Sequence, residues 1–340
     1  MSGCENLRVI VEGRVAEVRA VWFEDNKVKM IDQRTLPHEF RILSFCRCDE
    51  VAEAIRNMTI RGAPSIGAAA AYGLALSALN GDDLETAANM MRRTRPTAND
   101  LFYAVDYMLK AITSGEEPVT ASNAYADAIV EKCKRIGKNG SSLIRDHSKV
   151  MTHCNAGALA SVDVGTALAP LRIARDEGKD FFVYVSETRP RLQGMRLTSW
   201  ELLNEGIPHA IIADAASGHY MKKDVDLIIV GADRIVSNGD FANKIGTFEK
   251  AVLAKELGIP FYVAAPVSTF DFSIESGDEI PIESRSEDEV TEIEGRRIAP
   301  EGARALNPAF DVTPSRYVTG FITEVGILRP SEISKVKLKG

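Results

Sequence analysis

The feature that most constrains the fold is a change of pattern near Ser148. Up to about His147 apolar residues recur at helical spacing, whereas after Ser148 short β-rich runs alternate with helical stretches. Such alternation is typical of a parallel, doubly wound sheet, because consecutive parallel strands are joined through crossover helices. The runs expected to be strands are residues 149–153, 180–186, 209–213, 226–231, 260–265 and 317–323. The second half of the chain is therefore predicted to be a Rossmann-like α/β unit.

The part before Ser148 has two different patterns. Residues 8–35 alternate apolar with polar residues and break at Gly13 and at the Glu24–Lys27 turn, which predicts a small antiparallel β meander. Amphipathic segments then predict helices over residues 49–58, 65–80, 83–93, 97–113 and 121–138. For a chain of 340 residues we expect two domains. Residues 1–147 would form the β meander and helical domain, and residues 148–340 the Rossmann-like catalytic domain. Residues 278–306, rich in Glu, Ser, Arg and Pro, interrupt the alternation and predict a long ordered loop.

Composition excludes several kinds of partner. The formal charge of -7, with no basic cluster, argues against nucleic acid, which requires a basic face. No eighteen apolar residues run together and no leader pattern is present, so we expect a cytoplasmic protein that does not bind a membrane. Five scattered cysteines suit a reducing compartment. We interpret Cys46, Cys48 and Cys133 as small buried hydrophobic residues, since C-x-C is not the spacing of a zinc half-site.

Polar residues follow the predicted strands, and ligands of open α/β sheets bind at the carboxyl ends of the strands. These positions are His153–Cys154–Asn155, Glu187–Thr188–Arg189, Asp214, Gly231–Ala232–Asp233–Arg234, Ala265–Pro266 and Thr323–Glu324. A thiol, carboxylates and arginines would thus meet at one edge of the sheet. A purely structural sheet gains nothing from that set, so the sequence predicts a functional site there.

Cys154 is the thiol with the most informative context. It follows a predicted strand and precedes a run of small residues that we expect to form a helix, whose N-terminus would favour the thiolate. His153 should point to the opposite face of the strand, which suits packing or orientation better than base catalysis. A cysteine and an aspartate on different strand ends can act as base and acid in one proton relay. Neither a G-x-S-x-G elbow nor a GxGxxG fingerprint is present.

Two stretches suggest anion binding. Arg61, Gly62 and Ala63 precede a predicted helix start at Pro64, where backbone N–H groups and a guanidinium could bind a phosphate. A tight interhelical turn with a solvated arginine explains the same residues equally well. Asn243 and Lys244 are predicted to open a second helix, and a lysine in a first helical turn opposes the helix dipole unless an anion binds there.

The motifs taken together resemble one known family nearly from end to end. They are IRGAPSIG, RPTAND, THCNAG, ETRPRLQGMRLTSWEL, VGADRIVSNGDFANKIGT, PFYVAAPVSTFD, IPIE and NPAFDVTP. They are similar to those of the 5-methylthioribose-1-phosphate isomerases. That family belongs with the ribose-1,5-bisphosphate isomerases and with regulatory subunits of the guanine-nucleotide exchange factor of translation initiation. The resemblance implies a helical N-terminal domain, a Rossmann-like C-terminal domain, a homodimer and an aldose–ketose isomerisation in methionine salvage.

The resemblance also implies roles for particular residues. Cys154 and Asp233 match the catalytic pair. The substrate-binding positions are matched by Arg61, Gly62, Ala63, Arg95, Gln193, Asn243 and Lys244. The partner would be a small sugar phosphate, and the reaction needs neither a metal nor a cofactor. Its apolar methylthio end predicts a pocket lined by hydrophobic residues.

Two departures from the family bear on the choice of sugar. The segment DAASGHYMKK, residues 214–223, is closer to the ribose-bisphosphate enzymes, and Ser186 stands where an acidic residue is common. Ribose-1,5-bisphosphate isomerase and a non-enzymatic exchange-factor subunit therefore stay open as alternatives. The sequence also leaves open whether a proton or a hydride moves between C2 and C1.

Overall fold

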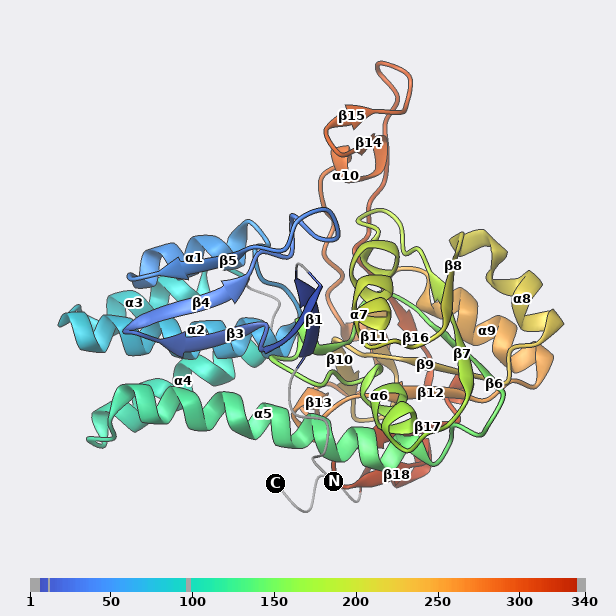
Figure 1. Ribbon diagram of the computed structural model, residues 1–340, viewed down its shortest axis with the longest axis horizontal. Coiled ribbons are helices and arrows are strands. Elements are labelled where there is room, and N and C mark those ends of the chain that lie inside the picture. Colours follow the sequence, from blue (N-terminus) through green and yellow to red (C-terminus); the bar gives the residue numbers. More distant parts are fainter. Residues whose placement is uncertain (1–6, 12, 96–98, 335–340) are drawn as a thin grey trace.

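The computed structural model describes residues 7–11, 13–95 and 99–334. Figure 1 shows a helical part and a sheet part side by side, with an arm that projects between them. Cys4 lies outside the described residues. None of the described helices combines the length and the hydropathy needed to cross a membrane.

A seven-stranded sheet forms the core of the second half. Its strands, from one edge to the other, are β18 (Gly326–Leu328), β17 (Gly320–Thr323), β12 (Phe261–Ala264), β9 (Leu227–Val230), β6 (Ser148–Thr152), β7 (Phe181–Ser186) and β8 (His209–Ile212). All pairs are parallel except β17 with β18. The six parallel strands follow the 3-2-1-4-5-6 order of Rossmann folds. The Rossmann-like prediction and all six predicted strands are confirmed.

Both faces of this sheet are buried because successive side chains of a strand point to opposite sides. Val150 packs in a cluster with residues of α6 (Ala169–Asp176) and α7 (Ser199–Asn204), whereas its neighbour Met151 packs in another with residues of α8 (Ser217–Lys223) and α9 (Thr247–Leu257). Near-continuous apolar strands are what a sheet covered on both faces requires.

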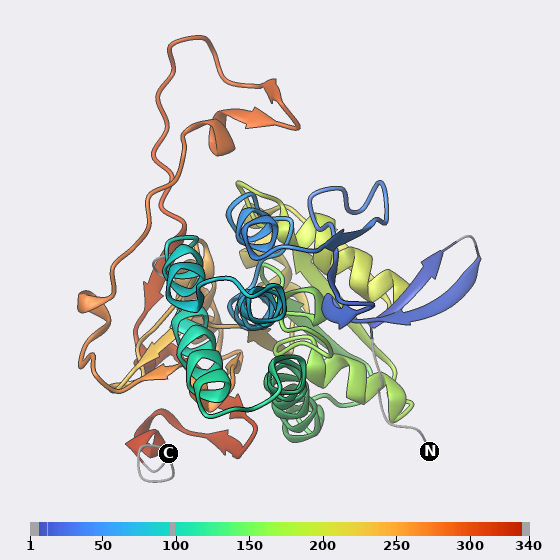
Figure 2. The same cartoon turned by 90° about the vertical axis from the view of Figure 1, so that its left-hand side faces the viewer.

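The helical part is built around α2 (Ala63–Asn80), with α1 (Cys48–Arg56), α3 (Leu84–Arg92), α4 (Asn99–Thr113) and α5 (Pro118–Ser141) near it. The middle of α2 is buried on all sides, which explains its run of alanines. A Cβ atom at Gly67 would lie 2.9 Å from the Tyr125 hydroxyl and 3.0 Å from the Asp100 carbonyl oxygen. Small residues therefore let α4 and α5 approach α2 closely, as the bundle of blue-green helices in Figure 2 shows.

Helix α5 connects the two parts. Its Tyr125 and Val130 belong to the helical core, while Ile136 belongs to a core cluster of the sheet. It also packs on α6 and β17. A domain boundary between residues 147 and 148 stays a prediction.

The N-terminal strands form two sheets rather than the single predicted meander. β1 (Leu7–Val11) and β2 (Arg14–Val18) make a hairpin, while β3 (Val21–Glu24), β4 (Lys27–Ile31) and β5 (Ile42–Phe45) make a separate sheet. The hairpin packs with Leu159 and with Trp200 of α7, both in the second half of the chain. The chain changes direction where the Ala20 amide donates to the Val162 carbonyl oxygen (2.8 Å), a long-range contact that local alternation cannot reveal.

Two further features were not predicted. A mixed sheet has the order β13 (Phe270–Asp271), β10 (Arg234–Val236), β11 (Phe241–Lys244) and β16 (Phe310–Thr313). Within residues 278–306, α10 (Asp288–Thr291), β14 (Glu292–Ile293) and β15 (Arg296–Arg297) lie at the outer part of the arm seen in Figures 1 and 2. The prediction of a long ordered segment agrees with this arm.

Candidate active site

A cavity lies at the carboxyl ends of the parallel strands, where the helical part meets the sheet. Each residue that the resemblance assigned to the site lines it: Arg61, Gly62, Ala63, Arg95, Cys154, Gln193, Asp233, Asn243 and Lys244. Cys154 follows β6 and Asp233 follows the adjacent strand β9, so both side chains lie at the same edge of the sheet, as predicted. The structure thus brings residues from 61 to 244 into one space.

Cys154 is held in an unusual backbone conformation. Its φ is +63°, a left-handed value that costs a non-glycine residue about 1–3 kcal/mol. Two hydrogen bonds fix it there: the Cys154 amide donates to Thr188 Oγ1 (2.8 Å), and its carbonyl accepts from Thr198 Oγ1 (2.6 Å). Strain that is over-determined in this way is typical of functional positions.

The predicted helix after Cys154 is wrong. Residues 155–157 are irregular, Ala158–Ala160 form one 3-10 turn, and the next α-helix begins only at Ala169. Small residues are needed here for close packing instead: a Cβ atom at Gly157 would lie 2.1 Å from a carboxylate oxygen of Glu201. The helix dipole therefore does not stabilise the thiolate.

Burial dominates the acid–base properties of the pair. It raises the pKa of the Cys154 thiol above its usual value, although the charges of Arg61 and Lys244 act in the opposite direction. It likewise raises the pKa of Asp233, against the charges of Lys244 and Arg285 in particular. The Asp233 side chain is exposed to the open space of the cavity, and desolvation by the protein atoms around that space shifts its equilibrium toward the neutral acid.

Arg61 is oriented by Asn155. Its guanidinium donates to the Asn155 carbonyl oxygen (3.1 Å) and also to Asn155 Oδ1. The Asn155 amide in turn donates to the buried carboxylate of Glu201 (2.8 Å), which fixes its orientation. Burial lowers the pKa of the Arg61 guanidinium. The solvated-arginine alternative is therefore wrong: Arg61 is partly buried and faces the cavity.

The start of α2 presents a second anion-binding element. Gly62 is its N-cap residue with φ +88°, Ala63 is its first residue, and no acidic side chain lies in its first turn. The positive end of the dipole of an 18-residue helix is thus uncompensated beside the cavity.

Asn243 and Lys244 do not open a helix as predicted. They end strand β11, and α9 begins at Thr247 after Gly246 with φ +96°. The Lys244 amine donates to the Ala309 carbonyl oxygen (2.7 Å) and lies 4.6 Å from the centre of the Phe310 ring. Burial lowers the pKa of Lys244, although Cys154 and Asp233 raise it. Lys244 still reaches the cavity, but from a strand that pairs with β16.

Arg95 and Gln193 complete the predicted set. Burial lowers the pKa of the Arg95 guanidinium, and the charge of Arg285 lowers it further. The buried Gln193 Oε1 and Arg61 Nε have no hydrogen-bond partner among the described residues. Buried polar atoms normally have partners, so both are available to a ligand.

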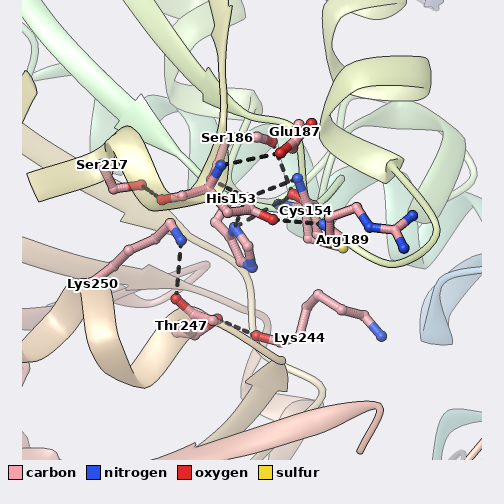
Figure 3. A network of polar contacts seen from close by, with 12 residues as sticks. His153, Cys154, Ser186, Glu187, Arg189, Ser217, Lys244, Thr247 and Lys250 are labelled. Carbon is pink, nitrogen blue, oxygen red and sulfur yellow. Dashed lines mark hydrogen bonds and ion pairs between the residues drawn. The ribbon is translucent and has the colours of Figure 1, made fainter. Parts of the chain in front are cut away.

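His153 belongs to a network of polar contacts next to Cys154 (Figure 3). Its Nε2 contacts the Ile245 carbonyl oxygen (2.8 Å), and burial lowers the pKa of its imidazole to about 3. A histidine that stays neutral suits the predicted orienting role. In the same network Ser186 donates to Asp214 (2.6 Å), which also accepts from the Thr188 amide (2.9 Å). An acidic residue at position 186, which is common in the family, would repel Asp214. Ser186 donates a hydrogen bond to Asp214 instead, so Ser186 fits its surroundings in this chain.

Sequence reasoning missed several residues of the cavity: Asp100, Arg191, Arg285 and Phe310. Asp100, Arg191 and Phe310 lie inside motifs already quoted for the resemblance, and Arg285 follows one of them by two residues. Their position within or next to these motifs was the signal that could have identified them as cavity residues. With them, the cavity holds the cations Arg61, Arg95, Arg191, Lys244 and Arg285 around a thiol and two carboxyl groups.

Comparison with known proteins identifies the family of the chain. Residues 59–330 match the Initiation factor 2 subunit family. The chain belongs to that family. A methylthioribose-1-phosphate isomerase of Geotalea uraniireducens (strain Rf4) is 50% identical over 330 residues, with 92% of this chain and 95% of the relative covered.

Solved structures of the family carry different names. The 5-methylthioribose 1-phosphate isomerase of Pyrococcus horikoshii OT3 superposes with a TM-score of 0.89 at 44% identity, covering 95% of this chain and 96% of that one. A protein of A. fulgidus titled translation initiation factor eIF-2B, subunit delta, gives 0.87 at 40% identity, covering 95% and 100%. Within this family the fold alone does not decide the function, so the site residues must do so.

Proposed function

We propose that this chain is an aldose–ketose isomerase that converts 5-methylthioribose 1-phosphate to 5-methylthioribulose 1-phosphate, a step of methionine salvage and hence of amino-acid biosynthesis. The observation that carries the proposal is one cavity in which Cys154 and Asp233, both with raised pKa, lie among five cationic side chains. The names of relatives about half identical over nearly the whole chain support it.

The substrate already carries phosphate on its anomeric carbon, so opening the ring gives no free aldehyde. In one route Asp233 donates its proton to the ring oxygen as the C1–O bond breaks. The Cys154 thiolate takes the proton from C2, which leaves an enol phosphate. Cys154 then returns the proton to C1, and the C2 hydroxyl gives its proton to Asp233 as the carbonyl forms.

In the second route the hydrogen on C2 moves to C1 with its electron pair as the ring opens. Asp233 again protonates the ring oxygen, and Cys154 takes the proton of the C2 hydroxyl. Turnover in D2O tests the enol route: deuterium on C1 of the product requires the enol, because the Cys154 thiol can exchange its proton with solvent before it protonates C1. A product without deuterium fits hydride transfer, and it also fits an enol route in which Cys154 returns the same proton before exchange.

Phosphate binding is assigned to the start of α2 and the cations beside it. The backbone of Gly62 and Ala63 offers the helix N-terminus, while Arg61 and Lys244 supply charge and hydrogen bonds. Arg95 and Gln193 would contact the sugar, and Asn243 would orient the ligand from β11. Residues of both halves thus surround the substrate, and closure over it would keep water from the intermediate.

One observation favours the rival substrate, ribose 1,5-bisphosphate. A second cavity adjoins the first and is lined by Arg34, Arg61, Arg191 and Arg196. Three of these guanidinium groups already have acceptors: Arg34 bonds to Asp32 (2.8 Å), Arg196 to the Leu36 carbonyl oxygen (2.9 Å) and Arg191 to Glu289 (2.7 Å). Engaged guanidinium groups are a poor basis for a second phosphate site, so we place this substrate second.

The direct test is an assay of the purified protein with both sugar phosphates in parallel. Faster turnover of the methylthio sugar supports the proposal, and faster turnover of the bisphosphate transfers it to the rival. If the protein turned over neither sugar, the remaining alternative would be a non-enzymatic subunit of the exchange factor. That alternative gives no reason for a thiol and a carboxyl group to share a cation-lined cavity.

The proposal extends to assembly and location. We assign a homodimer without a nucleic-acid partner, which light scattering of the purified protein would test. We assign the cytoplasm because Cys46, Cys48, Cys133 and Cys154 are all unpaired, as in a reducing compartment.

A further inference from the structure

An aromatic cavity, distinct from the arginine-lined cavity described above, adjoins the reaction cavity. It lies between α4 and α5, and its walls include Tyr103, Tyr107, Tyr125 and Ile129. Pro64, Asp100 and Pro266 line both cavities. The two spaces are therefore neighbours that meet at Asp100, and a molecule bound among the cations could extend one end between the tyrosines.

The walls of this cavity suit an apolar group. The Tyr125 ring lies 5.4 Å from the Tyr107 ring and 6.2 Å from the Tyr103 ring, centroid to centroid, so the three rings form one aromatic surface. Ala124 and Ala128 leave space beside it on α5. Aromatic ring edges contact thioether sulfur favourably, and aliphatic carbon gains from burial against them.

The charges at the cavity disfavour an anion. Lys132 is the one Lys or Arg side chain among the described residues that line it. The Asp100 carboxyl stands where the two cavities meet. Its pKa is raised to about 6 by burial, with the charge of Lys132 opposing the shift, so it is mostly ionised at neutral pH. A phosphate that left the cations for this cavity would pass a negative charge and would find Lys132 alone to compensate it among the described lining residues.

We propose that the cavity of Tyr103, Tyr107, Tyr125 and Ile129, named here the tyrosine pocket, binds the apolar thioether substituent on C5 of the substrate, and that Asp100 excludes a C5 phosphate. This inference rests on the proposed function. It places the two ends of the sugar in different surroundings. The C1 phosphate lies among the cations, and the C5 substituent lies among the aromatic rings.

The test compares four substrates: 5-methylthioribose 1-phosphate, its 5-ethylthio analogue, ribose 1-phosphate and ribose 1,5-bisphosphate. Ala128 lines the pocket and is exposed, so Ala128→Phe fills the pocket without placing the ring in the core between the helices. We expect KM for both thioether sugars to rise at least tenfold, with kcat/KM for ribose 1-phosphate changed less than twofold. Thr120→Phe adds the same ring to an exposed site of α5 outside the pocket and should change none of these constants.

Asp100→Asn tests the exclusion of phosphate. It keeps the shape of the side chain and removes the charge, so kcat/KM for ribose 1,5-bisphosphate should rise relative to the methylthio sugar by about tenfold. In the native enzyme, kcat/KM for ribose 1,5-bisphosphate relative to the methylthio sugar should also increase as pH falls through 6, where Asp100 becomes protonated. The charged groups that face Asp100 are Lys132 and Asp233. The C5 phosphate also titrates at about pH 6, so Asp100→Asn should lose the part of this shift that Asp100 causes and keep the smaller part that the phosphate causes.

The outcomes separate the two levels of inference. Turnover of none of the four sugars by the native protein overturns the proposed function and the pocket with it. Turnover of the methylthio sugar with an unchanged KM in Ala128→Phe overturns the pocket alone. A native enzyme that prefers the bisphosphate, or an unchanged substrate ratio in Asp100→Asn, overturns the exclusion by Asp100.

Discussion

Cys154 and Asp233 act as one unit if the relay is correct. Cys154→Ser keeps the size of the side chain but replaces a thiol by a hydroxyl of far higher pKa, and Asp233→Asn cannot release a proton. Each change should lower kcat by about 10²–10⁴-fold while the substrate still binds. The double mutant should be little worse than either single mutant, because removing one partner already disables the relay. Steady-state kinetics and calorimetric binding check both statements; multiplicative losses would contradict the relay.

Lys244 supplies part of the field that favours the Cys154 thiolate. Burial raises the pKa of the thiol and Lys244 lowers it, so Lys244→Met should raise that pKa further. Since only the thiolate is alkylated, the reaction with iodoacetamide near pH 8 should become several-fold slower. The assay needs a background that carries both Cys4→Ser and Cys46→Ser, because Cys4 lies outside the described residues and the Cys46 thiol is exposed. Lys149→Met, at a cation outside the cavity, is the control, and equal rates in the two variants would refute the coupling.

The exposed Cys46 shows a limit of predicting single residues from sequence. Cys48 and Cys133 are buried as expected, but Cys46 is exposed, so the interpretation was wrong there. Cys46 stands just after β5 and before α1, a junction where neither a strand nor a helix pattern fixes which way a side chain points. Periodicity identifies the buried face of an element and not the orientation of the residues between elements.

At the scale of elements, Gly62 determines how closely α2 approaches the site. A Cβ atom there would lie 2.4 Å from the Ala160 carbonyl oxygen, and the φ of +88° strains any other residue. Gly62→Ala should cost about 1–3 kcal/mol from the backbone conformation alone and should displace the start of α2, where we propose that the phosphate binds. Gly81→Ala at the other end of the helix also has positive φ, +74°, but meets nothing within 4 Å. Thermal unfolding should report a loss for both, whereas KM should rise only in Gly62→Ala.

An ion pair connects the arm to the site. Arg191 of the cavity bonds to Glu289 of the arm (2.7 Å), and Arg285 of the arm lines the cavity itself. Glu289→Gln weakens this connection, so KM should rise several-fold with kcat nearly unchanged, and proteases should cut the arm faster. Glu287→Gln removes a carboxylate that pairs with the exposed Arg304 elsewhere on the arm, and should leave KM unaltered. A higher KM in both variants would mean that the pairs only stabilise the arm's own fold.

The elements that the sequence predicted well are those with local patterns. Runs such as Leu227–Val230 are apolar throughout, which marks strands buried on both faces. β10 and β11 were missed because they are short and depend on pairing with the distant β13 and β16. The helix predicted at Asn243 and Lys244 failed for that reason: the chain there pairs with Asp311 and Phe310, which lie more than sixty residues away. The segment 214–223, which favoured the ribose-bisphosphate enzymes, contributes no side chain to the cavity and says little about the sugar.

At the scale of the whole molecule, charge is distributed unevenly. The chain carries a formal charge of -7, yet five cations face one another across the reaction cavity. Arg191 and Arg285 pair with Glu289 and Glu283. The repulsion that costs stability in the empty protein is therefore mainly among Arg61, Arg95 and Lys244, and an anion that binds between them removes it. Under the proposed function, this cluster would attract a phosphorylated sugar to a protein whose overall charge repels it, and binding would stabilise both halves.

Inorganic phosphate should therefore stabilise the protein more than chloride at equal ionic strength. The cations come from the helical part (Arg61, Arg95), the sheet part (Arg191, Lys244) and the arm (Arg285), so a bound anion connects all three. A ligand at 100 times its Kd adds about 2.7 kcal/mol to the free energy of unfolding. The midpoint of thermal unfolding should rise with phosphate concentration, and this rise should be much smaller in Lys244→Met than in Lys149→Met. Equal midpoints in phosphate and chloride would mean that the five charges do not form one anion site, and the assignment of the C1 phosphate to this cluster would be wrong.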